Sequence, residues 1–136
     1  MPRISHLFFK SAILFLIAGI GIGLHMSIAH SYTVAGAHAH INLLGWVTSA
    51  IFGGYYALNP AKAVGRLPML HFGVYTLGVV VMAVSLYLLL GGNTALEPVV
   101  AASSLVTFAG VLLFAVVVFM PAKAGAGARP GLLPAE

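Results

Sequence analysis

Six histidines hold most of this sequence's capacity for chemistry, because the chain has no cysteine and only two acidic residues, Glu97 and Glu136. The missing cysteines exclude disulfides, thiolate metal sites and iron–sulfur clusters. The two distant acids exclude catalysis by a carboxylate pair. Any bound metal would therefore rely on imidazole, thioether or oxygen ligands. Four histidines lie close together in the sequence: His25, His30, His38 and His40.

These histidines belong to a chain that is 61% hydrophobic and only 6% charged, whereas soluble domains carry about a quarter charged residues. A helix of roughly 20 apolar residues crosses the hydrocarbon core of a bilayer. Four segments of this kind occur, separated by Gly, Asn and Pro punctuation. The sequence therefore predicts an all-α integral membrane four-helix bundle within a single domain, residues 1–120. We expect the helices at 7–30, 37–58, 67–90 and 98–120.

The charges predict the topology of this bundle. All six basic residues flank one end of the expected helices, and Glu97 flanks the other. The positive-inside bias makes that basic end cytoplasmic, with both termini inside and the helices running up, down, up and down. We expect a bacterial inner membrane protein, a disordered cytoplasmic tail at 121–136 and no nucleic-acid partner. The basic residues are Arg3, Lys10, Lys62, Arg66, Lys123 and Arg129.

Small and polar residues mark the faces that these helices should turn toward one another, because polar groups avoid lipid and small residues allow close packing. On the first helix we expect the face of Ala18, Gly21 and His25 to point inward, and Gly19-x-x-x-Gly23 is a second possible contact. The second helix carries one small and polar stripe, which consists of His38, Asn42, Gly45, Ser49, Gly53 and Tyr56.

His25 and His38 are the two histidines predicted to converge. The first two helices are antiparallel, so residues near the outer end of each come close together. Two neutral imidazoles on opposite sides of an iron are suitable axial ligands for heme b, and bundle cores often hold cofactors in this way. Gly21 and Gly45 would leave space for the flat macrocycle. His71 is too close to the other end to join this site; with Tyr75 it would line a quinone pocket or simply pack.

Two alternatives remain open. A copper site at the outer surface would combine imidazole and thioether ligands. Its candidate ligands are His25, Met26, His30, His38 and His40. The other alternative is a cofactor-free accessory or scaffold subunit, since a small helical bundle implies no particular activity. A four-helix bundle would cover the edges of a heme poorly, which favours a homodimer.

The second predicted helix also carries a string that has a family resemblance. It runs His38-Ala-His40-Ile-Asn42-Leu-Leu-Gly45-Trp46, followed by Tyr55-Tyr56 and Asn59-Pro60. With the first helix, it resembles the first two membrane helices of the catalytic subunit of heme-copper oxidases, most closely the nitric oxide reductase and high-affinity oxidase branches. The Gly-Trp spacing places His38 at the position of a low-spin heme ligand; an alignment on His-x-Asn would choose His40 instead.

The resemblance implies a heme site that includes Asn42 and Trp46 beside the histidine. It stops after the second helix, and the family's later helices carry its other heme ligand and its active-site histidines. Reduction of oxygen or nitric oxide at a binuclear centre is therefore not expected. The prediction is a heme protein for electron transfer or for heme or gas sensing, with a redox partner or an oxidase complex. Its second axial ligand would be His25 or a residue of another subunit.

Overall fold

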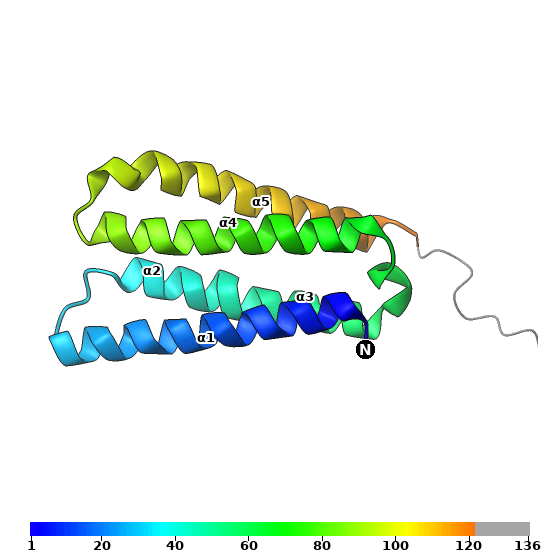
Figure 1. Ribbon diagram of the computed structural model, residues 1–136, viewed down its shortest axis with the longest axis horizontal. Helices are drawn as coiled ribbons and strands as arrows, with labels where there is room; N and C mark the ends of the chain where they lie inside the picture. Colours follow the sequence, from blue (N-terminus) through cyan, green and yellow to red (C-terminus); the bar gives the residue numbers. More distant parts are fainter. Residues whose placement is uncertain (122–136) are drawn as a thin grey trace, which may run out of the picture.

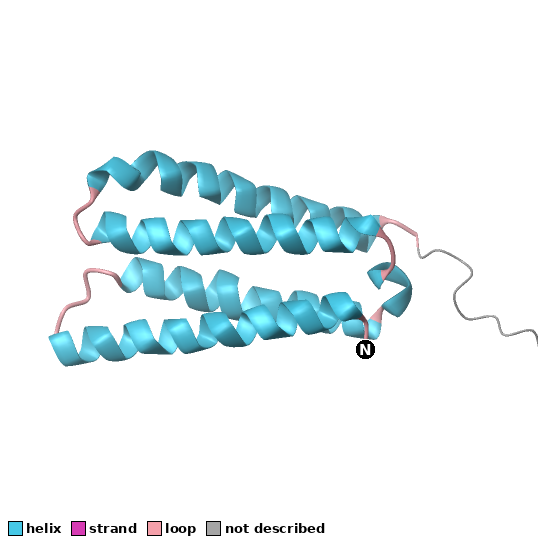
Figure 2. Ribbon diagram, viewed as in Figure 1, coloured by secondary structure: helices cyan, strands magenta, loops and turns pink. Residues whose placement is uncertain are grey.

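The computed structural model describes residues 1–121, and every element in that range is helical (Figure 2). The four long helices begin and end within a few residues of the expected bounds. The predicted tail lies outside the described residues except for Pro121. In chain order the elements are α1 (Arg3–Ala29), α2 (Ala35–His40), η1 (Ile41–Thr48), α3 (Ser49–Leu58), η2 (Pro60–Ala63), α4 (Arg66–Leu90), η3 (Thr94–Leu96) and α5 (Glu97–Phe119).

The elements form two helical hairpins that lie side by side (Figure 1). In one hairpin, α1 packs against the continuous helix made of α2, η1 and α3; in the other, α4 packs against α5. Successive long helices alternate in direction, so the start of α1, the connection η2 and the end of α5 meet at one end. Within residues 1–121, three helical segments are long and apolar enough to cross a membrane: Arg3–Ala29, Arg66–Leu90 and Thr94–Phe119.

The composite helix contains a π-helical segment, η1, that the sequence did not predict. A π-helix pairs each carbonyl with the N–H five residues later. Thr48 follows the same spacing with its side chain, since its hydroxyl donates to the carbonyl of Leu43 at 2.8 Å. The Leu44 carbonyl also accepts a bond from the Tyr75 hydroxyl at 2.9 Å. The segment thus offers a backbone acceptor to the neighbouring hairpin.

Small residues allow the helices to approach closely, as expected for membrane helices. A Cβ added to Gly78 would lie 2.7 Å from the backbone nitrogen of Thr107, and one added to Gly110 would lie 2.8 Å from the Cα of Tyr75. The predicted inner stripe of the second helix is confirmed. Its members Gly45, Ser49, Gly53 and Tyr56 are buried, and His38 and Asn42 are half-buried.

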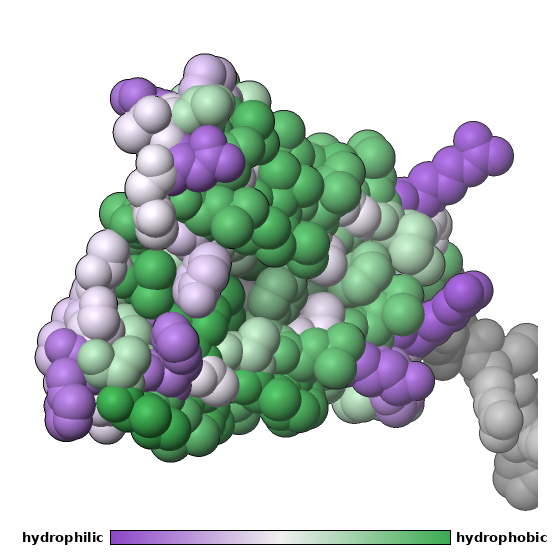
Figure 3. Space-filling model, turned by 60° about the vertical axis from the view of Figure 1, so that its left-hand side comes forward, coloured by the Kyte–Doolittle hydropathy of each residue, from purple (hydrophilic) through white to green (hydrophobic). Residues whose placement is uncertain are grey.

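Aromatic side chains fill the core near the end where the chain begins. Phe8, Phe52, Tyr56 and Tyr75 are buried there and are drawn from α1, α3 and α4. The outer surface is also largely apolar: in Figure 3 a broad hydrophobic band covers the middle of the bundle, and the hydrophilic residues gather toward its two ends. Large exposed apolar surfaces of this kind are rare on soluble monomers.

Candidate cofactor site

His38 joins the second helix to α1. Its Nδ1 lies 2.9 Å from the carbonyl oxygen of Gly19. A carbonyl oxygen can only accept, so the Nδ1–H of His38 is the donor. The ring lies over Gly23, where an added Cβ would come within 3.0 Å of the imidazole Cε1. Gly23 therefore makes room for the imidazole between the helices, and Gly19 makes room for the side chain of Asn42. The observed role of His38 is an interhelical hydrogen bond.

His25 lies on a different face of α1. It is two residues from Gly23, which places the two positions about 200° apart at about 100° per residue. Gly23 faces His38, whereas the His25 side chain is exposed. The expected convergence of His25 and His38 within one chain is therefore wrong. Its cause is the choice of face on α1: the Gly19 and Gly23 face, rather than that of Gly21 and His25, packs on the second helix.

The surroundings of His38 also differ from the expected heme pocket. A Cβ at Gly45 would lie 2.6 Å from the Cγ of Phe15, so the Phe15 ring takes the space expected for a macrocycle. The Asn42 side-chain amide donates to the backbone carbonyl of His38 at 2.8 Å and packs over Gly19. Trp46 is 37% exposed on the outside of the helix. Phe15, Asn42 and Gly45 thus form a contact between the first two helices.

A groove between α1 and α4 brings two of the predicted residues together. Its volume is about 390 Å³, within the usual range for ligand sites, and its walls are almost entirely apolar. Gly21 opens it, since no atom lies within 4 Å of a Cβ added there. Tyr87 is a further polar residue of the groove, and it was not among the predicted site residues. The lining residues are Ala18, Gly21, Ile22, His25, Ile41, Ala83, Val84, Tyr87 and Leu88.

The other outer histidines do not complete a metal site. The Nδ1–H of His40 donates to the carbonyl of Gly36 at 2.7 Å, on an exposed face of α2. His30 ends α1 in a left-handed conformation and is exposed, while Met26 is buried. Within residues 1–121, no three histidine or acidic side chains lie close enough together to hold one metal ion. The described part of one chain therefore does not bring together the ligands of the alternative copper site.

His71 is fully buried in an aromatic cage near the other end of the bundle. Its Nδ1 shares a hydrogen bond with the Tyr56 hydroxyl at 3.0 Å, and its Nε2 has no partner. The rings of Phe8, Phe52 and Phe114 lie 4.7 to 5.3 Å from the imidazole, between centroids. A quinone could reach His71 or Tyr75 only if these rings moved, so the observed role of the pair is packing.

Comparisons of the chain with protein-family models, curated proteins and solved structures give no match.

Proposed function

We propose that this chain is an integral membrane b-type heme protein that uses His25 as an axial ligand in the groove between α1 and α4. The observation that carries the proposal is the combination, in one apolar groove, of an exposed imidazole with the open space beside Gly21. A polar group on a lipid-facing surface is costly, which makes it a candidate for function. Heme offers such an imidazole an iron, and the apolar walls suit the macrocycle.

The membrane part of the proposal rests on surface and charge. Residues such as Leu14, Ile28 and Leu105 are 69 to 79% exposed on the sides of the helices. Lipid would remove these side chains from water, and the helices satisfy their own backbone hydrogen bonds. The basic residues at the shared end of the hairpins favour a cytoplasmic location for both termini, in a bacterial inner membrane.

Each residue would have a distinct part in heme binding. His25 would hold the iron, Gly21 would keep the groove open and Tyr87 would offer a hydroxyl to a polar edge of the ligand. His38 would position the second helix through Gly19. Heme, when bound, supplies a one-electron centre that can also bind a small gas. One chain contributes one histidine to this groove, so a homodimer or a redox partner would supply any second ligand.

The visible spectrum of the purified protein, oxidised and reduced, tests this proposal. We expect Soret and alpha bands that are lost in His25→Ala. The matched control is His40→Ala, since His40 is also exposed near the same end of the bundle, and it should keep the bands. A protein that stays colourless after hemin is added would contradict heme binding. Loss of the bands in His40→Ala alone would contradict the choice of ligand.

A second candidate function, an accessory subunit without a cofactor, is favoured by the way His38 and His71 are used. Both histidines form hydrogen bonds between helices. In this case the histidines stabilise a compact helical partner for a larger membrane complex. A colourless protein that co-purifies in a stable membrane complex would favour this function over the heme protein.

A further inference from the structure

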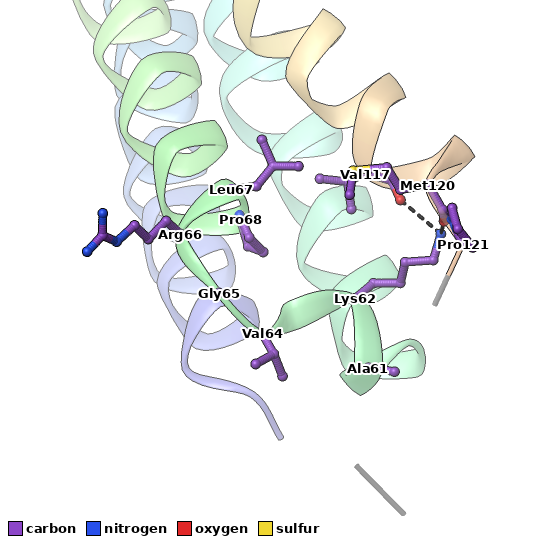
Figure 4. A pocket seen from close by; sticks show the side chains of 10 residues that line it. All are labelled: Ala61, Lys62, Val64, Gly65, Arg66, Leu67, Pro68, Val117, Met120 and Pro121. Atoms are coloured by element: carbon purple, nitrogen blue, oxygen red, sulfur yellow. Dashed lines mark hydrogen bonds between the residues drawn. The ribbon is translucent and has the colours of Figure 1, made fainter. Parts of the chain in front are cut away.

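Arg66 lies at the start of α4 and lines a small cavity (Figure 4). It also lines an apolar groove along α4. The cavity has a volume of about 120 Å³ and lies between η2, α4 and the end of α5. Figure 4 shows the Arg66 side chain pointing away from Lys62 and from α5. The guanidinium therefore belongs to the outer side of α4, where the groove begins.

The Lys62 ammonium already has hydrogen-bond partners within the chain. It donates to the carbonyls of Val117 and Val118 at 2.9 and 2.8 Å, and also to that of Met120. Figure 4 shows the Lys62 side chain reaching toward Val117 and Met120. These are carbonyls at the C-terminus of α5, where a helix attracts a cation. Of the two basic residues at this cavity, Arg66 is thus the one that can serve a ligand outside the chain.

The apolar groove runs from Arg66 along the outer face of α4. Leu70 and Leu77 are 54 and 62% exposed along it, and no atom lies within 4 Å of a Cβ added to Gly73. The missing side chain at Gly73 therefore hollows the middle of the groove. The lining residues are Gly65, Arg66, Met69, Leu70, Gly73, Val74 and Leu77.

The charges at the end of the bundle where α4 begins favour an anionic ligand. Within the described residues, four basic residues flank this end of the bundle, and the one acidic residue, Glu97, begins α5 at the opposite end. Arg66 thus has no carboxylate partner in residues 1–121. Arginine suits phosphate because its planar guanidinium donates two parallel hydrogen bonds. Basic sites on the cytoplasmic side of membrane helices are typical positions for anionic lipid headgroups.

We propose that Arg66 and the groove along α4 bind one anionic phospholipid, with the phosphate at the guanidinium and an acyl chain along Leu70, Gly73 and Leu77. Charge complementarity identifies the headgroup, and the apolar groove that continues from Arg66 identifies the chain. This inference rests on the membrane part of the proposed function and is independent of heme.

Native mass spectrometry of the full chain, released from detergent with added phosphatidylglycerol or phosphatidylcholine, tests the proposal. We expect retained phosphatidylglycerol at lipid concentrations where phosphatidylcholine is lost. Arg66→Gln should weaken phosphatidylglycerol binding about fivefold, the effect of one basic residue near an anionic lipid. Gly73→Leu should weaken it by filling the groove. The matched control is Arg3→Gln, which removes another exposed charge at the same end and should have little effect.

Three outcomes would overturn the proposal. They are equal retention of the two lipids, unchanged binding in Arg66→Gln, and an equal loss in Arg3→Gln, which would indicate general charge attraction. Competition with inorganic phosphate is a further test. If millimolar phosphate displaces the lipid, the groove contributes nothing to lipid binding and the site is one for free phosphate. A protein that fails to enter membranes would instead contradict the proposed function itself.

Discussion

The Nδ1–H of His38 donates a hydrogen bond of 2.9 Å to the carbonyl oxygen of Gly19. This bond lies on the face of α1 that packs on the second helix, the face of Gly19 and Gly23, whereas His25 lines the groove toward α4. The two histidines that the sequence predicted to converge, His25 and His38, thus have separate roles. One holds two helices together, and the other lies in a groove open to a ligand.

Substitutions of Gly21 and Gly45 should distinguish the role of the groove in heme binding from the role of the helix contact in stability. Gly21→Leu has open space for its side chain, so the fold should be retained, but the groove would be filled and heme binding lost. Gly45→Leu would collide with Phe15 and should cost about 1 to 3 kcal/mol through overpacking. Thermal unfolding in detergent and a hemin titration measure the two effects.

Gly54→Ala is the control for both glycines, because nothing lies within 4 Å of a Cβ added to Gly54. Its midpoint of thermal unfolding and its hemin binding should equal those of the natural protein. If Gly45→Leu is as stable as this control, the close packing of Phe15 is contradicted.

Removing the Tyr56 hydroxyl should lower the stability of the protein, because the buried His71 would lose its hydrogen-bond partner. Tyr56→Phe keeps the ring in the aromatic cage but leaves both ring nitrogens of His71 without a side-chain partner. An unsatisfied buried polar group costs about 1 to 3 kcal/mol. We expect a lower midpoint of thermal unfolding, monitored by circular dichroism. Tyr55→Phe, one position away and half-buried, should change the midpoint much less; equal shifts would argue against the Tyr56–His71 bond.

Lys62 should hold the end of α5 in place. Lys62→Met retains most of the aliphatic chain but removes the ammonium that caps Val117, Val118 and Met120. We expect faster amide hydrogen exchange in the last turn of α5, with little change in α1. Lys10→Met is the control, because Lys10 is exposed on α1. Unchanged exchange in α5 would mean that the capping is unimportant.

The positions of the helices could be predicted from the sequence, because apolar runs of membrane-spanning length alternate with Gly, Asn and Pro. The inner face of the second helix was also predictable, since its small and polar residues repeat in register from His38 to Tyr56. Even the π-helical segment within it did not turn this stripe away from α1.

The arrangement of the site was less predictable because it depends on packing between helices. The first helix has two stripes of small residues, and nothing in the sequence states that Gly19 and Gly23 face the partner while Gly21 faces the groove. His71 has Tyr75 one helical turn away, but its hydrogen-bond partner is Tyr56, on another helix. Which face packs, and which residue becomes a hydrogen-bond partner, is decided only when the helices pack together.

The most direct test of the account is a hemin titration of the His25→Ala and His38→Ala variants, followed by visible absorbance. We predict that His25→Ala abolishes saturable binding, whereas His38→Ala still binds hemin although its thermal stability falls. Saturable binding in His25→Ala, together with its loss in a folded His38→Ala, would contradict the α1–α4 groove as the heme site.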